Sequence, residues 1–105
     1  MEQKEQARPR REHPRVPANF VVHVEMPGGA VKARARDLSM AGLYLDAPLK
    51  VPDRVQVLLV LGEEIGSVVT TCEVERRDEH GVALSFARID WDELMVLARF
   101  LSPRL

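Results

Sequence analysis

Residues 20–36 read FVVHVEMPGGAVKARAR, and this stretch decides the fold. From Phe20 to Met26, apolar side chains occupy every second position, which is the period of a strand with one buried face. From Val31 to Arg36, small apolar residues alternate with three cations in the same way. The Pro-Gly-Gly sequence between the two runs predicts a turn. The stretch therefore predicts an antiparallel hairpin with its cations on the outer face.

Further runs with strand character follow the hairpin, at residues 43–46, 55–61, 68–77 and 82–86. Turn-forming residues such as Pro52 and Gly81 separate them. Many short strands joined by tight turns predict a small closed barrel, because closure removes the exposed edges of a sheet. The run 55–61 is apolar on nearly both faces, so we expect another element, such as a packed helix, to cover part of its second face.

The hydrophobic period changes near the end of the chain. After Asp90, apolar residues recur with helical spacing, at Trp91, Leu94, Met95, Ala98 and Leu101. Asp90 is placed to cap this helix, with Glu93 three residues later completing a capping box. The sequence thus predicts about six antiparallel strands followed by one amphipathic helix, in a single domain of 105 residues.

The composition is that of an ordinary globular protein, with 46% apolar and 30% charged residues. The net charge of −1 gives no overall field that would attract the chain to nucleic acid or anionic lipid. A single cysteine, Cys72, excludes an intramolecular disulfide, and the hydrophilic N-terminus lacks the apolar stretch of a signal peptide. The most apolar run, 55–61, is too short to span a bilayer. We therefore expect a soluble, cytoplasmic protein without membrane insertion.

The cations are nevertheless concentrated near the N-terminus, where a third of all Lys and Arg residues fall in the first fifteen positions. Arg11 and Arg15 form an R-x-x-x-R motif in a segment that Pro14 keeps out of a helix. In an extended chain, residues four apart lie on the order of 13 Å from each other. A guanidinium offers a planar fork of donors that binds phosphate bidentately and stacks on a purine face.

A second motif, D-x-S-x-x-G, is formed by Asp37, Ser39 and Gly42 after the hairpin. A carboxylate here can accept hydrogen bonds from the ring N–H and exocyclic amine of a guanine, while the hydroxyl can donate to an acceptor on base or phosphate. Gly42 has no Cβ, so the backbone can turn sharply and approach a ligand. The alternative for an isolated turn of this kind is local, with Asp37 and Ser39 bonding neighbouring backbone.

In this order and spacing, R-x-x-x-R followed by D-x-S-x-x-G resembles the signature of the PilZ family, bacterial domains that bind cyclic di-GMP. The resemblance covers roughly Arg10 to Leu101 and includes Gly-Val-Ala-Leu-Ser-Phe at residues 81–86, a pattern typical of the family's last strand. It implies a mainly β fold, a six-stranded antiparallel PilZ-type β-barrel with a C-terminal α-helix. The implied organisation is a flexible N-terminal tail (1–9) and a PilZ domain (10–105), divided into a ligand-binding arm (10–17), a barrel (20–86) and a helix (90–102).

By the same resemblance, Arg11 and Arg15 would clamp the phosphates and stack on guanine, while Asp37 and Ser39 would read a guanine edge. Arg10 is a further candidate, because an arginine there in similar domains can help to hold a stacked pair of ligands, and Arg76 is a secondary one. The implied cyclic di-GMP site comprises Arg10, Arg11, Arg15, Asp37, Ser39 and Gly42. The implied function is that of a receptor and adaptor that converts second-messenger binding into altered contacts with an effector protein.

Two alternatives stay open. A PilZ-like adaptor that does not bind nucleotide would have the same barrel, although here every motif residue is present. A small nucleic-acid-binding barrel would carry several aromatic side chains on one sheet face, whereas the few aromatics here fit core positions. His13, His23 and His80 lie in separate segments without metal-ligand spacing, and the sequence has neither a P-loop nor a nucleophile elbow. We therefore expect no catalytic residue, metal or cofactor, and no nucleic-acid polymer as partner.

Overall fold

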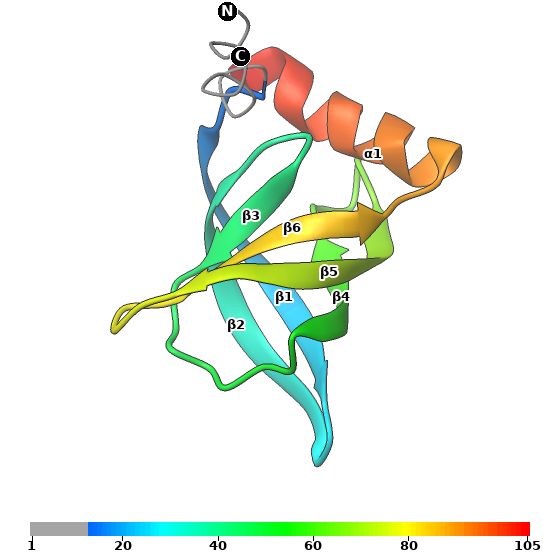
Figure 1. Cartoon of the computed structure of the whole chain (residues 1–105). Coiled ribbons are helices and arrows are strands. Elements are labelled where there is room, and N and C mark those ends of the chain that lie inside the picture. Colours follow the sequence, from blue (N-terminus) through cyan, green and yellow to red (C-terminus); the bar gives the residue numbers. More distant parts are fainter. Residues whose placement is uncertain (1–12) are drawn as a thin grey trace, which may run out of the picture.

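The computed structural model describes residues 13–105, so Arg10 and Arg11 lie outside the described part of the chain. Within that part, six strands form a closed barrel, and one α-helix lies across one of its ends (Figure 1). The elements in chain order are β1 (Val16–Met26), β2 (Gly29–Leu38), β3 (Gly42–Leu45), β4 (Arg54–Val60), β5 (Ser67–Arg77), β6 (Val82–Arg88), α1 (Trp91–Leu101) and a short 3₁₀ turn, η3 (Ser102–Arg104).

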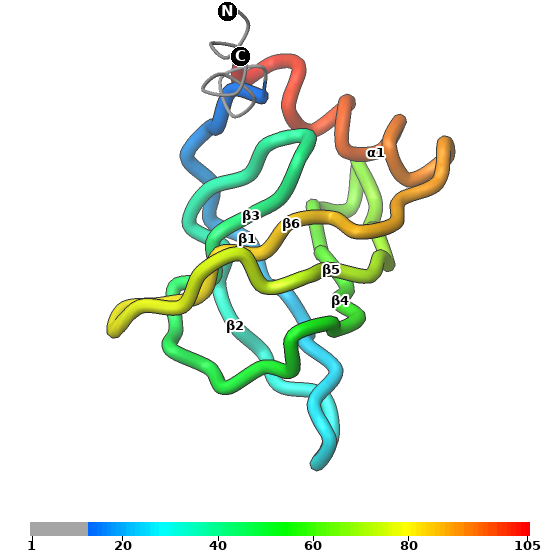
Figure 2. The backbone as a smooth tube through the Cα atoms, viewed as in Figure 1, coloured from blue at the N-terminus to red at the C-terminus, as the bar shows by residue number. Residues whose placement is uncertain are grey.

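The strands pair antiparallel in the spatial order β1-β2-β3-β6-β5-β4, and β4 closes the barrel onto β1. The path of the chain through this order can be followed in Figure 2. The tip of the β1–β2 hairpin projects beyond the barrel, because β4 pairs only with Val21–Val24 of β1. The predicted architecture, a mainly β six-stranded antiparallel barrel with a C-terminal helix, is confirmed.

Strand β1 begins at Val16, earlier than the alternating run that predicted it. Val16 pairs with Leu38 and Pro17 with Asp37, and a register shift follows before Phe20. Such an irregularity is one of the places where a strand tolerates proline, which has no N–H for the ladder. The last two residues of the expected arm (10–17) therefore belong to the barrel. This pairing places Arg15 immediately before β1, beside the end of β2.

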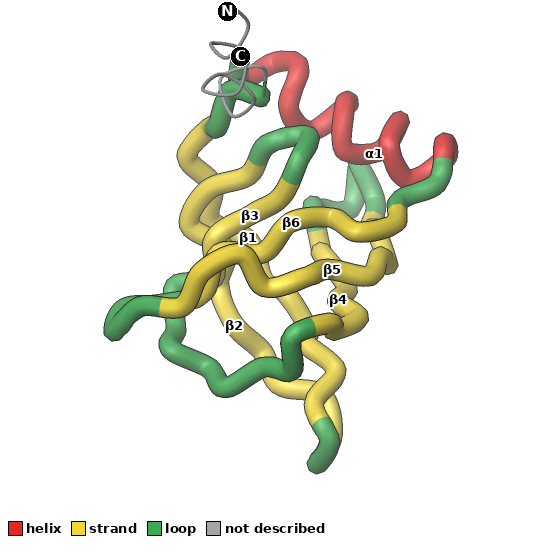
Figure 3. Tube along the Cα trace, viewed as in Figure 1, coloured by secondary structure: helices red, strands yellow, loops and turns green. Residues whose placement is uncertain are grey.

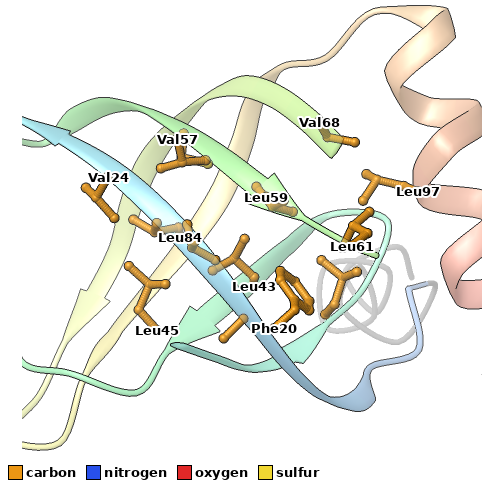
Figure 4. Close-up of a cluster of buried hydrophobic side chains, with 14 of the residues drawn as sticks. Phe20, Val24, Leu43, Leu45, Val57, Leu59, Leu61, Val68, Leu84 and Leu97 are labelled. Atoms are coloured by element: carbon orange, nitrogen blue, oxygen red, sulfur yellow. The ribbon is translucent and has the colours of Figure 1, made fainter. Parts of the chain in front are cut away.

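The core is one cluster of apolar side chains inside the barrel (Figure 4). The inward-facing positions of the strands supply most of it, and each of the following is at most 1% exposed: Val22, Val24, Leu43, Leu45, Val57, Leu59 and Leu84. The helix adds Leu97, Phe100 and Leu101. The rings of Phe20 on β1 and Phe100 on α1 meet edge to face, with centroids 5.5 Å apart. Helix and barrel thus share a single hydrophobic core.

The helix does not cover the outer face of β4, so that expectation is wrong. Figure 3 shows the helix across the end of the barrel instead. On the outer faces of β4 and β5, Val60 is 39% and Val69 is 44% exposed. The physical reason is that the buried side chains of α1, Leu97, Phe100 and Leu101, join the hydrophobic core of the barrel, where removal of apolar surface from water is favourable.

The helix begins where its capping box predicted. The Asp90 carboxylate accepts a hydrogen bond from the backbone N–H of Glu93 at 3.0 Å, and the Glu93 carboxylate accepts one from the N–H of Asp90 at 3.5 Å. In the last turn, Arg99 donates to the carbonyl oxygens of Glu64 and Ile65, which fixes the β4–β5 loop to the helix. Among residues 13–105, no helix combines the length and the apolarity needed to cross a membrane.

Candidate functional site

The D-x-S-x-x-G motif forms the tight turn between β2 and β3. The hydroxyl oxygen of Ser39 accepts hydrogen bonds from the backbone N–H groups of Ala41 at 3.0 Å and Gly42 at 3.3 Å. The N–H of Ser39 donates to the carbonyl oxygen of Gly42 at 2.9 Å. Ser39 is only 1% exposed. Its side chain is therefore engaged with the turn itself, which is the local role that such a sequence allows.

Gly42 is required by the packing of two strands. It pairs with Ser85 on β6, and a Cβ at this position would lie 2.0 Å from the carbonyl oxygen of Leu84 and 2.9 Å from the Cα of Ser85. The positive-φ glycines among the described residues are elsewhere, at Gly29, Gly62 and Gly66. The backbone approach that Gly42 permits is thus between β3 and β6, at the base of the motif turn.

The two motifs meet at Arg15 and Asp37. The Nη1 atom of Arg15 lies 2.6 Å from Oδ1 of Asp37, in a hydrogen-bonded ion pair between side chains that are 49% and 27% exposed. The pairing of Pro17 with Asp37 accounts for this contact, because it aligns the start of β1 with the end of β2. An ion pair this exposed contributes only about 0–1 kcal/mol to stability, so a ligand can displace it at small cost.

A depression of about 360 Å³ adjoins this ion pair. It is lined by His13 and Arg15 before β1, Ala41 in the motif turn, Glu75 and Arg76 on β5, and residues 83–85 on β6. Several of these side chains are small, which leaves an open surface between the two arginines. The charged groups at this depression are the guanidiniums of Arg15 and Arg76 and the carboxylate of Glu75, with the Asp37 carboxylate beside Arg15. Guanidiniums bind anionic groups and carboxylates accept from hydrogen-bond donors, so a ligand that carries both kinds of group fits this chemistry.

A larger groove, of about 590 Å³, lies between the first residues of β1, the end of β4 and the C-terminal end of α1. Its charged residue, Arg104, donates to the carbonyl oxygen of Phe100 and lies over that residue's ring, with Cζ 3.8 Å from the centroid. None of the described motif residues lines this groove. We therefore place the candidate site at the smaller depression, where the motif chemistry is.

The structure adds one residue that the sequence analysis missed, Tyr44 on β3. Its hydroxyl donates to Oδ1 of Asp78 at 2.8 Å, and the Arg36 guanidinium lies over its ring with Cζ 4.3 Å from the centroid. Burial raises the pKa of the Tyr44 phenol, and the hydrogen bond to Asp78 raises it further. The same hydrogen bond lowers the pKa of the Asp78 carboxyl, helped by the backbone N–H groups of His80 and Gly81. The only signal in sequence was a single tyrosine among outward-facing positions.

Residues 13–105 offer neither a metal site nor a reactive thiol. No group of three or more His, Cys, Asp or Glu side chains is arranged to hold a metal ion there. Cys72 is fully buried among apolar neighbours, and this burial raises the pKa of its thiol to about 12. A thiol that stays protonated is a poor nucleophile, so Cys72 acts as a small core residue.

The chain matches one protein family and is similar to solved structures with the same fold. The chain matches the PilZ domain family over residues 9–102. Among solved structures, it is similar to the Bacillus subtilis inhibitor of motility MotI/DgrA, with a TM-score of 0.74, 18% identity, and coverage of 90% of this chain and 50% of that protein. It is also similar to the PilZ domain of CeSA from a cellulose-synthesizing bacterium, with a TM-score of 0.62, 19% identity, and coverage of 88% and 99%.

The structural similarities and the family match support different conclusions. At 18% and 19% identity, the two structures support the fold alone. The chain spans half the length of the motility inhibitor, so that protein has a part with no counterpart here. No curated protein sequence matches the chain significantly. The family match, which spans nearly the whole described chain, is what bears on function.

Proposed function

We propose, from the premise that the chain belongs to the PilZ domain family, that it is a bacterial, cytoplasmic receptor for cyclic di-GMP. In this role it is a binding module rather than an enzyme, and it converts capture of the second messenger into altered contacts with an effector protein. The observation that carries the proposal is the ion pair of Arg15 and Asp37, which joins two motifs 22 residues apart at one depression.

The proposed site comprises Arg10, Arg11, Arg15, Asp37, Ser39 and Gly42. Arg15 lines the depression and Asp37 is its ion-pair partner, and they would contact a phosphate and a guanine edge respectively. Ser39 and Gly42 support the proposal indirectly, since their contacts fix the turn that carries Asp37. Arg10 and Arg11 lie outside the described residues and enter through the family motif.

The proposed mechanism is an exchange of partners. In the free protein, Asp37 and Arg15 satisfy each other. A ligand with two phosphates and two guanines offers an anion to the arginine and a pair of N–H donors to the carboxylate, so both groups gain a partner when their mutual contact opens. The part of the arm that precedes β1, residues 10–15, would then wrap around the ligand against the barrel, with charge-assisted contacts offsetting the entropy of ordering.

The proposed partner of the ligand-bound domain is an effector protein. One similar structure is a motility inhibitor and the other comes from a cellulose-synthesizing bacterium, so the shared fold occurs in proteins with unlike names. An effector protein that recognises the ligand-ordered arm fits a chain whose described part is one small domain.

Isothermal titration calorimetry with cyclic di-GMP tests the proposal, with cyclic di-AMP and GTP as controls. We expect saturable binding to cyclic di-GMP alone, and the stoichiometry then distinguishes a single ligand from a stacked pair. No heat at ligand concentrations well above the micromolar range, and no thermal shift, would favour the second candidate, a PilZ-like adaptor without a nucleotide ligand.

A further inference from the structure

Arg76 lines the same depression as Arg15, although it comes from a different part of the chain. An exposed arginine on a strand normally samples many rotamers, and a ligand that uses it must first restrict them. The surroundings of Arg76 reduce this freedom. Its Nε atom lies 3.8 Å from Oδ2 of Asp78, and its Cζ lies 5.9 Å from the centroid of the Tyr44 ring.

Asp78 is itself held in a single orientation. Its Oδ1 atom accepts three hydrogen bonds, from the Tyr44 hydroxyl at 2.8 Å and from the backbone N–H groups of His80 and Gly81 at 2.9 Å each. These bonds leave the second carboxylate oxygen, Oδ2, for Arg76. The carboxylate is thus a fixed anchor between the β5–β6 turn and the arginine.

Tyr44 is the most buried member of this group. It is only 4% exposed, and a Cβ at Gly81 would lie 2.8 Å from the Cζ atom of its ring. The ring therefore packs directly on the backbone of the β5–β6 turn. The Arg36 guanidinium lies over the ring as well. The buried phenol thus contacts both the backbone of the turn and the carboxylate that lies beside Arg76.

We propose that Tyr44 is a positioning residue for ligand capture: through Asp78 it holds the Arg76 guanidinium at the depression, where Arg76 contacts an anionic group of the ligand. This inference rests on the proposed function and adds to it. Arg15 approaches the ligand from the segment before β1, and Arg76 approaches it from β5. A dianionic ligand then meets two guanidiniums whose spacing the barrel sets.

A double-mutant cycle on cyclic di-GMP affinity tests the inference with the full chain. Tyr44→Phe keeps the ring and removes only the hydroxyl. We expect it to weaken binding roughly threefold to tenfold, the scale of coupling between neighbouring groups, and to have less than about a twofold effect in an Arg76→Ala background. Arg77→Ala is the matched control, because it removes the same charge from the next residue of β5, whose side chain contacts Val51 and Asp53 instead.

Asp78→Asn provides a second route to the same cycle should Tyr44→Phe lower the folded fraction, and it should show the same dependence on Arg76. A purely structural role for Tyr44 predicts equal losses in both backgrounds, which would overturn the inference while leaving the receptor function intact. Absence of binding by the wild-type protein would overturn both.

An independent readout needs no ligand. The ¹⁵N relaxation of the arginine Nε–H groups reports side-chain order directly, and Arg77 serves as an internal reference. We expect Arg76 Nε to be ordered in the wild-type protein and to become mobile in Tyr44→Phe, with Arg77 unchanged. An Arg76 that is equally mobile in both proteins would contradict positioning by Tyr44.

Discussion

Asp37 and Arg15 form a hydrogen-bonded ion pair at 2.6 Å, although 22 residues separate them in sequence. The contact depends on the pairing of β1 with β2, which brings the segment before β1 beside the turn after β2. Each partner carries one of the two chemical functions that a guanine nucleotide requires. Because both side chains remain partly exposed, the pair is accessible to a ligand and contributes little to the stability of the fold.

Removal of the Arg15 side chain should affect the binding of cyclic di-GMP far more than the stability of the fold. Arg15→Ala should weaken cyclic di-GMP binding by about 1.5–3 kcal/mol, the range for hydrogen bonds to charged groups, and Arg11→Ala should act similarly. The melting temperature should stay nearly unchanged. Calorimetric titration and thermal unfolding measure the two effects. Arg54→Ala is the matched control, since Arg54 forms a comparably exposed ion pair with Glu73, and neither residue lines the depression. Unchanged affinity in both Arg11→Ala and Arg15→Ala would remove the arm from the site.

Asp37 should determine the choice of base. A carboxylate accepts from the ring N–H and the exocyclic amine of guanine, whereas adenine does not present this pair of donors. Asp37→Ala should therefore reduce the affinity for cyclic di-GMP and leave little preference over cyclic di-AMP. Competition titrations with both dinucleotides measure this preference. Equal binding of the two by the wild-type protein would be incompatible with the role given to Asp37.

A substitution of Gly42 in the motif turn should lower the stability of the protein. In Gly42→Ala, the new Cβ meets backbone atoms of β6, so we expect a destabilisation of roughly 1–3 kcal/mol or more, as for overpacked cores. Urea denaturation gives the free energy of unfolding. Gly28→Ala is the control, because a Cβ at Gly28 meets nothing within 4 Å. Equal stability of the two variants would contradict the β3–β6 contact.

The hydrogen bond between Tyr44 and Asp78 should give stability a defined pH window. The folded pKa of Asp78 lies below its ordinary value of 3.8, so this contribution is present above that pH and is lost as pH falls through the lowered pKa. The folded pKa of Tyr44 lies above 10.0, so the contribution is also lost as pH rises through that raised value. The difference in unfolding free energy between wild type and Tyr44→Phe should thus be constant from about pH 5 to 9 and shrink at both extremes. A difference that does not shrink as the pH falls below 3.8 would refute this assignment.

The helix should be part of the barrel's core. Leu97 is fully buried, so Leu97→Ala should destabilise the protein by about 2–5 kcal/mol. Met95 on the same helix is 48% exposed, and Met95→Ala should change stability by less than about 0.5 kcal/mol. Chemical denaturation of both variants measures this contrast. Similar values for the two would place the helix outside the cooperative unit.

Local patterns predicted the elements of this fold well, because a strand's alternation and a helix's capping box are encoded within a few residues. The hairpin from Phe20 and the helix after Asp90 are examples. Features that depend on contacts between residues far apart in sequence could not be predicted from such local patterns. Val16 joins β1 only because Leu38 pairs with it, and the helix closes the barrel end only because that end is open.

In the candidate site, too, some residues could be predicted from local motifs and others depend on distant partners. The motif indicated Arg15 and Asp37 as site residues, and the structure brings them into contact. Ser39 and Gly42 were expected at the ligand. Ser39 instead bonds its own turn, which was the local alternative, whereas the contact of Gly42 with β6 is revealed only by the register of β3 and β6. Tyr44 could not be found from sequence, since its partner Asp78 lies 34 residues away.

The most direct test of the central claim is a ¹H–¹⁵N titration of the isotopically labelled protein with cyclic di-GMP. We predict saturable shifts of the backbone amides in residues 37–42 and 83–85, with residues 54–58 of β4 unaffected. Shifts confined to the larger groove beside Phe20 and Phe100, or no shifts at millimolar ligand, would contradict a cyclic di-GMP site at the junction of Arg15 and Asp37.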